Sequence, residues 1–153
     1  MTALPPHAAR ARWLALAALW LAAACSQPTS GPLSIAWGRE PCAHCSMAIG
    51  EARFAAELRL GPRELLRFDD FGCAIVWLAE HSDSGEPLEI WVMDQDREEW
   101  LDARKALYRP QQRTPMAWGF GAVPARETGA VDFEAAKRSV LARKKERASG
   151  GGS

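Results

Sequence analysis

A short apolar run that ends at a cysteine decides which part of this chain can fold. Arg10 and Arg12 precede the apolar residues 13–21, and three alanines then lead directly to Cys25. A basic start, an apolar run well below the ~20 residues of a bilayer span, and small residues before a cleavage point are typical of an export signal. We therefore predict that residues 1–24 are a signal peptide and that the exported chain begins at Cys25.

Cys25 itself is expected to receive a lipid. A cysteine placed directly after small residues resembles the lipobox of bacterial lipoproteins, with Ala22 at the third position before it. The alternative is ordinary cleavage after Ala24, which would leave Cys25 as a plain thiol. We expect lipidation, a membrane attachment through that lipid alone, and a location on the periplasmic face. Residues 26–27 (Ser-Gln) favour the outer membrane, by analogy with known lipoproteins.

The composition after the signal fits one ordinary domain. The full chain has 19 Lys+Arg and 19 Asp+Glu, and loss of Arg10 and Arg12 leaves 17 against 19. A nearly balanced charge gives no electrostatic footprint for nucleic acid, so we expect no nucleic-acid partner. The cysteines say more, because four cysteines minus a lipidated Cys25 leave three. An odd number of thiols cannot form a complete disulfide framework in an oxidising compartment.

Four segments are predicted along the chain. They are the signal peptide (1–24), a lipid anchor with a flexible Pro/Gly/Ser-rich tether (25–40), a folded domain (41–143), and a charged, Gly/Ser-rich disordered tail (144–153).

Hydrophobic periodicity predicts an α+β fold with antiparallel sheets. Residues 54–60 and 64–69 are strand-like and are joined by Gly61-Pro62, which predicts a hairpin. A helical pattern follows over 72–80 and an alternating strand over 88–93, which gives the order ββαβ.

The second half repeats this order more loosely, as ββα. Residues 100–108 and 116–123 are expected to be extended, and 133–143 to be a helix capped by Asp132.

The densest group of metal-binding residue types is the segment Cys42-Ala-His-Cys45-Ser-Met47. It offers two thiols, the His44 imidazole and a thioether within six residues. Sulfur donors suit a soft ion, so Cu(I) is the leading candidate, whereas methionine is a poor ligand for structural zinc. Two alternatives stay open: a structural disulfide between Cys42 and Cys45, and a thiol–disulfide exchange pair. The exchange pair normally lies between a strand and a helix, and this segment precedes a strand.

Other candidate residues have simpler interpretations from the sequence. We interpret Cys73 as a small buried core residue and Met116 as packing, unless the fold brings Met116 near the two cysteines. His81 is expected to interact with the C-terminal end of its helix. Asp69 and Asp70 are expected to cap the start of that helix.

Taken together, six blocks in this order resemble the NosL family of accessory lipoproteins for nitrous oxide reductase. The blocks are PCAHCSMAI, FAAELRL, RFDDFGCAIVWL, IWVMD, EWLDARKALY and TPMAWGFGAV, and they span about residues 41–123. The resemblance implies two ββαβ-type units related to the organomercurial lyase fold. It also implies a monomeric Cu(I)-binding metallochaperone, not an enzyme, that delivers copper for assembly of the reductase's copper centre.

Carried onto this chain, the resemblance places copper at Cys42, Cys45, Met47 and Met116. The implied partners are nitrous oxide reductase or its maturation machinery. The alternative from another class is an enzyme built on the same cysteines, either a thiol–disulfide oxidoreductase or an organomercurial lyase-like protein, with Asp69 or Asp70 as the proton donor.

Overall fold

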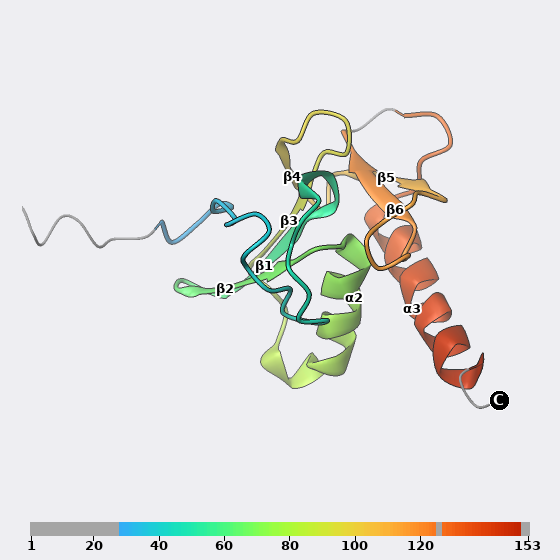
Figure 1. The fold of residues 1–153 in the computed structure, drawn as a ribbon, viewed down its shortest axis with the longest axis horizontal. Helices are drawn as coiled ribbons and strands as arrows, with labels where there is room; N and C mark the ends of the chain where they lie inside the picture. The colour runs from blue at the N-terminus through green and yellow to red at the C-terminus, as the bar shows by residue number, and fades with distance from the viewer. Residues whose placement is uncertain (1–27, 125–126, 151–153) are drawn as a thin grey trace, which may run out of the picture.

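A computed structural model describes residues 28–124 and 127–150, and Figure 1 shows their arrangement. The predicted signal peptide (1–24) and the predicted lipidation site, Cys25, lie outside the described residues. Within the described part of the chain, no helix combines the length and the hydropathy that a bilayer span requires.

Four antiparallel strands form the main sheet, in the order β2-β1-β3-β4. Their bounds are β1 Ala56–Gly61, β2 Glu64–Phe68, β3 Glu89–Met93 and β4 Trp100–Asp102. β1 and β2 form the predicted hairpin, and β3 pairs with the other side of β1 after an intervening helix. The predicted ββαβ order of the first half is confirmed.

Two helices and a two-stranded sheet complete the fold. The bounds are α2 Phe71–Glu80, β5 Leu107–Pro110, β6 Phe120–Val123 and α3 Phe133–Gly150. α2 packs between the main sheet and α3 (Figure 1). Three aromatic rings connect α2, β5 and α3. The ring centroid of Phe71 in α2 lies 4.3 Å from that of Tyr108 in β5 and 6.1 Å from that of Phe133 in α3. The α+β class with antiparallel sheets is confirmed.

The second half is the looser ββα unit, formed by β5, β6 and α3; the described residues contain no strand after α3, which would be the third strand of the ββαβ unit that the resemblance implies. Residues 100–108 are not one extended run. The N–H groups of Lys105 and Ala106 each bond back to the carbonyl of Asp102 at 3.0 Å, and this turn separates β4 from β5. β4 therefore joins the main sheet, and Met116 lies in a turn that precedes β6.

Side chains cap both helices where the sequence predicts it. Asp70 Oδ1 accepts from the N–H of Gly72 at 2.8 Å, and Asp132 Oδ1 accepts from that of Ala135 at 2.7 Å. At the end of α2, His81 Nδ1 lies 2.9 Å from the carbonyl oxygen of Trp77, and the two rings stack. The predicted C-terminal role of His81 is confirmed.

The predicted disordered tail was wrong for residues 144–150, which continue α3. The charges that suggested disorder belong to good helix formers, and two of them find partners on the folded domain. Lys144 Nζ lies 2.9 Å from a Glu80 oxygen, and Arg147 donates to the carbonyl oxygen of Ala117 at 2.8 Å.

The predicted flexible tether is also wrong for its second half, because residues 31–40 lie against the main sheet. Carboxylates of the strands accept the backbone N–H groups of this segment, with Gly31 N 2.8 Å from Glu89 and Leu33 N 3.0 Å from Glu57. Ile35 is buried in the core. Composition suggested a linker, but partners distant in sequence satisfy its backbone.

Candidate metal centre

Cys42 and Cys45 lie in a tight turn between residues 41 and 48, which form an isolated antiparallel bridge. The Cys42 N–H donates to the carbonyl of Met47 at 2.8 Å, and the Ser46 N–H donates to that of Cys42 at 2.9 Å. Ser46 has a φ of +63°, so this turn includes a left-handed residue that is not glycine. The Ala43 N–H donates to the carbonyl of Arg67 at 2.8 Å, which attaches the turn to β2.

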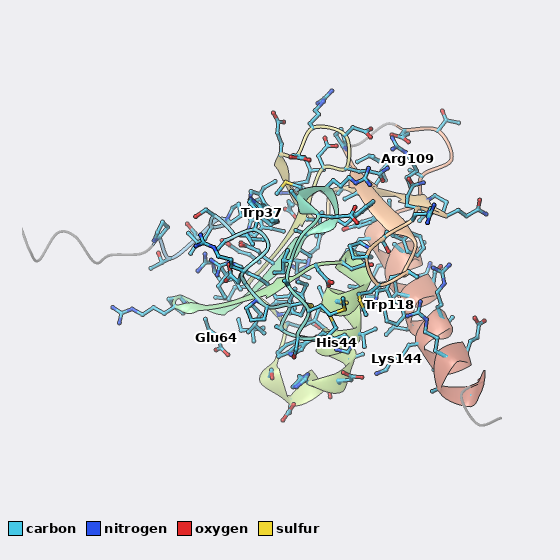
Figure 2. The ribbon with its side chains drawn as sticks, in the orientation of Figure 1. Trp37, His44, Glu64, Arg109, Trp118 and Lys144 are labelled. Carbon is cyan, nitrogen blue, oxygen red and sulfur yellow. The ribbon has the colours of Figure 1, made fainter. Side chains whose placement is uncertain are left out.

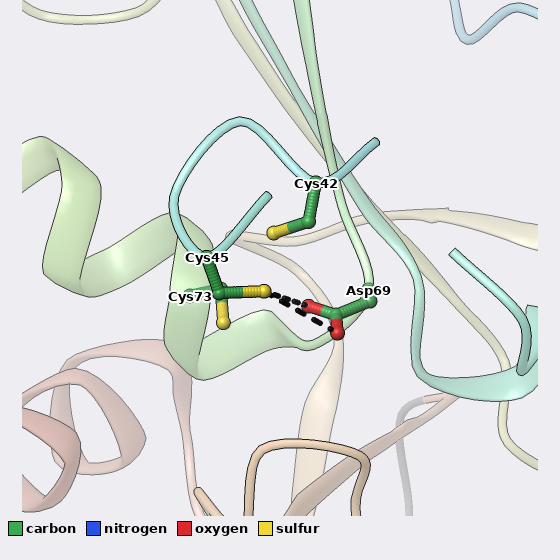
Figure 3. Close-up of side chains that lie close together, drawn as sticks. All are labelled: Cys42, Cys45, Asp69 and Cys73. Carbon is green, nitrogen blue, oxygen red and sulfur yellow. Dashed lines mark hydrogen bonds between the residues drawn. The ribbon is translucent and has the colours of Figure 1, made fainter. Parts of the chain in front are cut away.

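Asp69 and Cys73 come from the connection between β2 and α2. Asp69 follows directly after β2, and Cys73 lies in the first turn of α2. Asp69 precedes the extended cap residue Asp70 and Cys73 follows it in the helix, and both side chains face the turn of residues 42–47. Figure 3 shows the four side chains converging. One ligand atom from each of Cys42, Cys45, Asp69 and Cys73 lies within 4.8 Å of all the others.

The cluster is largely shielded from solvent. Cys42 is 2% exposed, Asp69 is 2% exposed and Cys73 is fully buried, whereas Cys45 is partly exposed. The Cys45 sulfur lies 3.7 Å from both oxygens of Asp69 and donates towards them (Figure 3). Burial raises the pKa of Asp69 to about 6, so this carboxyl titrates close to neutral pH.

The three thiols have very different proton affinities. Hydrogen bonding from the Cys73 thiol lowers the pKa of Cys42 to about 4, with further donation from backbone N–H groups nearby. Burial raises the pKa of Cys45 to about 11. The hydrogen bond between the Cys73 thiol and the Cys42 sulfur raises the pKa of Cys73 above its usual value. The contact between Cys42 and Cys73 therefore favours a thiolate on Cys42 and a protonated thiol on Cys73.

Three sulfurs and a carboxylate form a donor set that could bind a soft or borderline metal ion. All three described cysteines are free thiols. The segment of Cys42 and Cys45 is a turn that packs beside β2, and it does not begin a helix, as a thiol–disulfide exchange pair would normally require. Metal binding therefore fits this arrangement better than disulfide exchange.

The structure brings together two of the four predicted ligands, Cys42 and Cys45. The other two predicted ligands, Met47 and Met116, stay predictions. Met47 follows in the same turn and is 57% exposed. Met116 is partly buried, and its N–H donates to Asp70 Oδ2 at 3.2 Å, beside the start of α2. His44, labelled in Figure 2, has its Nδ1 3.4 Å from a carboxylate oxygen of Glu80.

Sequence reasoning missed the roles of Cys73 and Asp69 in the cluster. Cys73 is buried, as predicted, but it is buried against the other two sulfurs. Asp70 alone provides the predicted cap, and the extended backbone there turns Asp69 to the opposite side. The four-residue spacing of Asp69 and Cys73 around a predicted helix start was the available signal. The sequence alone could not show that the turn of residues 42–47 lies across from it.

Comparison with solved structures identifies a similar fold. The crystal structure of the copper chaperone NosL from Shewanella denitrificans superposes with a TM-score of 0.53 at 16% sequence identity. The match covers 76% of this chain and 89% of that chain. No protein-family model and no curated sequence matches. The resemblance predicted from the sequence is therefore confirmed at the level of the fold: this chain has a NosL-like architecture.

Proposed function

We propose that this chain is a Cu(I)-binding metallochaperone and that Cys42, Cys45 and Cys73 hold the ion. The observation behind this proposal is the convergence of three sulfurs within 4.8 Å in a shielded site. Cu(I) is favoured over zinc because thiolates and thioethers are soft ligands, and Met47 and Met116 lie on the two loops beside the cluster. The copper-chaperone description of the structurally similar protein supports the same ion.

Capture and release of the ion follow from the chemistry of the ligands. The lowered pKa of Cys42 favours the thiolate that binds Cu(I), whereas the raised pKa values of Cys45 and Cys73 mean that each of these thiols releases a proton when it binds. Asp69 lies within reach of the Cys45 proton. A site of few sulfur ligands releases its ion when an incoming thiol, thioether or imidazole adds to the metal and one protein sulfur leaves.

The direct test is an anaerobic Cu(I) titration of the reduced protein against a competing chelator. We expect one ion per chain, with a sulfur-only or sulfur-dominated shell in X-ray absorption. The double variant Cys42→Ser/Cys45→Ser should lose tight binding, and Ser46→Ala, in the same turn, should keep it. Wild-type affinity in the double variant would rule out this assignment.

We further propose that the protein acts on the periplasmic face of a bacterial membrane, attached through lipid on Cys25, with the outer membrane favoured. Its expected recipient is nitrous oxide reductase or the machinery that assembles the reductase's copper centre. Support comes from the sequence resemblance and from the NosL-like fold. Copper-loaded protein should restore activity to copper-free reductase, and the Cys42→Ser/Cys45→Ser variant should not. Membrane fractionation of Cys25→Ser tests the anchor, because this variant should leave the membrane fraction.

One observation favours a second function, cleavage of carbon–mercury bonds. The pKa of Asp69 is raised to about 6 and its oxygens lie 3.7 Å from the Cys45 sulfur, so this carboxylate can take up the proton of that thiol and hold it beside the cluster. Two thiolates would bind mercury, the carbon–mercury bond would break as carbon takes a proton from Asp69, and Hg(II) would remain on sulfur. Release of benzene from phenylmercury by the wild type, but not by Asp69→Asn, would establish this activity; its absence would leave the carrier function.

A further inference from the structure

The loop of residues 114–119, which contains Met116, is held against the start of α2. Asp70 Oδ2 accepts from the Thr114 hydroxyl at 2.5 Å and from the Met116 N–H at 3.2 Å. Trp118 packs on Gly72 so closely that a Cβ there would lie 2.1 Å from Trp118 Cγ. Because Asp70 and Gly72 lie between Asp69 and Cys73 along the chain, this loop and the cluster contact the same short segment.

The opposite side of the same loop is held by α3. The Arg147 guanidinium donates to the carbonyl of Met116 at 3.2 Å and to that of Ala117 at 2.8 Å, and it lies 4.1 Å from the ring centre of Trp118. Arg143 donates to the carbonyl of Trp118. Ala117 has a φ of +55°, so the loop includes a conformation that these donors help to maintain.

The same turn of α3 also reaches the other loop of the site. Lys144 Nζ lies 2.9 Å from one oxygen of Glu80, whose second oxygen lies 3.4 Å from His44 Nδ1. His44 lies between Cys42 and Cys45 in the sequence. Figure 2 shows Lys144, Trp118 and His44 around the same end of the molecule.

We propose that Arg147 is a positioning residue for the metal centre: it fixes the loop of Met116 beside the cysteine cluster from outside the site. Together with Arg143 and Lys144, Arg147 forms a basic cluster on α3. This cluster links the loop of residues 114–119 to the turn of residues 42–47. Arg147 is exposed and is not itself a ligand. Its planar guanidinium reaches two adjacent carbonyls and an aromatic face at once, which a lysine ammonium cannot reproduce. This inference rests on the proposed copper site.

The test compares Arg147→Ala, Arg147→Lys and Lys145→Ala. Lys145 is exposed on the same turn and makes no hydrogen bond or ion pair to the described residues, so its loss controls for charge. We expect Arg147→Ala to weaken Cu(I) binding by about tenfold, as loss of an outer partner of a metal ligand typically does. Arg147→Lys should recover part of this loss, and Lys145→Ala should bind as the wild type does.

A second readout does not depend on copper. With ¹³C-methyl methionine, the Met116 methyl signal of the copper-free protein should shift and broaden in Arg147→Ala and stay unchanged in Lys145→Ala. The signal of Met93, a buried residue at the end of β3, reports whether the variant remains folded. A wild-type Met116 signal and wild-type Cu(I) affinity in folded Arg147→Ala would overturn the positioning role. Failure of the wild type to bind Cu(I) would instead refute the proposed function.

Discussion

The Cys42 and Cys73 thiols act on each other across the gap between the turn of residues 42–47 and α2. Their contact lowers the pKa of one thiol and raises that of the other, so the negative charge is localised on Cys42. Localisation has a functional value, because a thiolate is both the nucleophile and the metal ligand. Single substitutions at Cys73 can separate this effect from metal coordination.

We predict that Cys73→Ala raises the pKa of Cys42 from about 4 towards that of an ordinary thiol, because the largest stabilising hydrogen bond is lost. Cys73→Ser keeps a donor at this position and should leave most of the depression in place. The measurement is the ultraviolet absorbance of the thiolate as a function of pH in reduced, metal-free protein. Identical titrations of the two variants would contradict the assigned cause.

Gly72 is the residue where the smallest substitution should have a large effect. Gly72→Ala would place a Cβ 2.1 Å from Trp118 Cγ, and we expect it to cost about 1–3 kcal/mol of unfolding free energy through overpacking. It should also displace the loop of Met116. Gly50→Ala is the matched control, since its Cβ would have its nearest neighbour at 4.0 Å. Chemical denaturation of both variants checks this, and equal stabilities would contradict it.

At the scale of elements, the first half of the fold could be predicted from the sequence because its signals are local. The hairpin is marked by Gly61-Pro62 and α2 by the Asp70 cap, and both were found. α3 could be predicted only as far as residue 143, because its last turns depend on Glu80 and on carbonyls of a distant loop. The same limit hid the role of Cys73 in the cluster, since nothing local to α2 indicates which loop covers it.

The strands β1 and β2 are joined by a charged pair that also holds the segment of residues 31–40. Glu57 is fully buried and accepts from Arg67 Nε at 3.0 Å and from the Leu33 N–H at 3.0 Å. We predict that Arg67→Met costs about 3 kcal/mol of stability, because it leaves a buried carboxylate without its main partner.

The double variant Glu57→Gln/Arg67→Met should recover much of this loss, since it removes the uncompensated charge. Glu51→Ala breaks an ion pair in which both side chains are about half exposed, and it should cost little. Thermal unfolding of the wild type, Arg67→Met, Glu57→Gln and the double variant gives the coupling energy of the pair. Additive losses at Glu57 and Arg67 would show that the pair does not act as a unit.

For the whole molecule, binding of Cu(I) at the proposed site would be linked to proton release. At pH 7 the protons of Cys45 and Cys73 must leave if all three sulfurs bind Cu(I), because the pKa of Cys45 is about 11 and that of Cys73 is raised. We predict that Cu(I) affinity rises with pH across the neutral range, by up to about a hundredfold per pH unit for two protons released. Below about pH 4, Cys42 also becomes protonated and the dependence steepens.

Competition titrations at two pH values one unit apart, corrected for the chelator's own protonation, measure this slope. Direct proton release into weakly buffered solution provides an independent count. An affinity that does not change with pH would mean that Cys42 alone supplies the thiolate, with neutral sulfur donors completing the site.

Because the cluster is unequally exposed, an ion bound there would have one side open to solvent and one side closed by the core. Cys42 and Cys73 are closed off by the core, whereas Cys45 is partly open and Met47 is 57% exposed beside it. A ligand from the proposed recipient would approach over the exposed edge formed by Cys45 and Met47. The bond to Cys45 would then be the first to be replaced and the bond to Cys73 the last. Transfer from the proposed copper site would then have one direction, which the packing around the sulfurs sets.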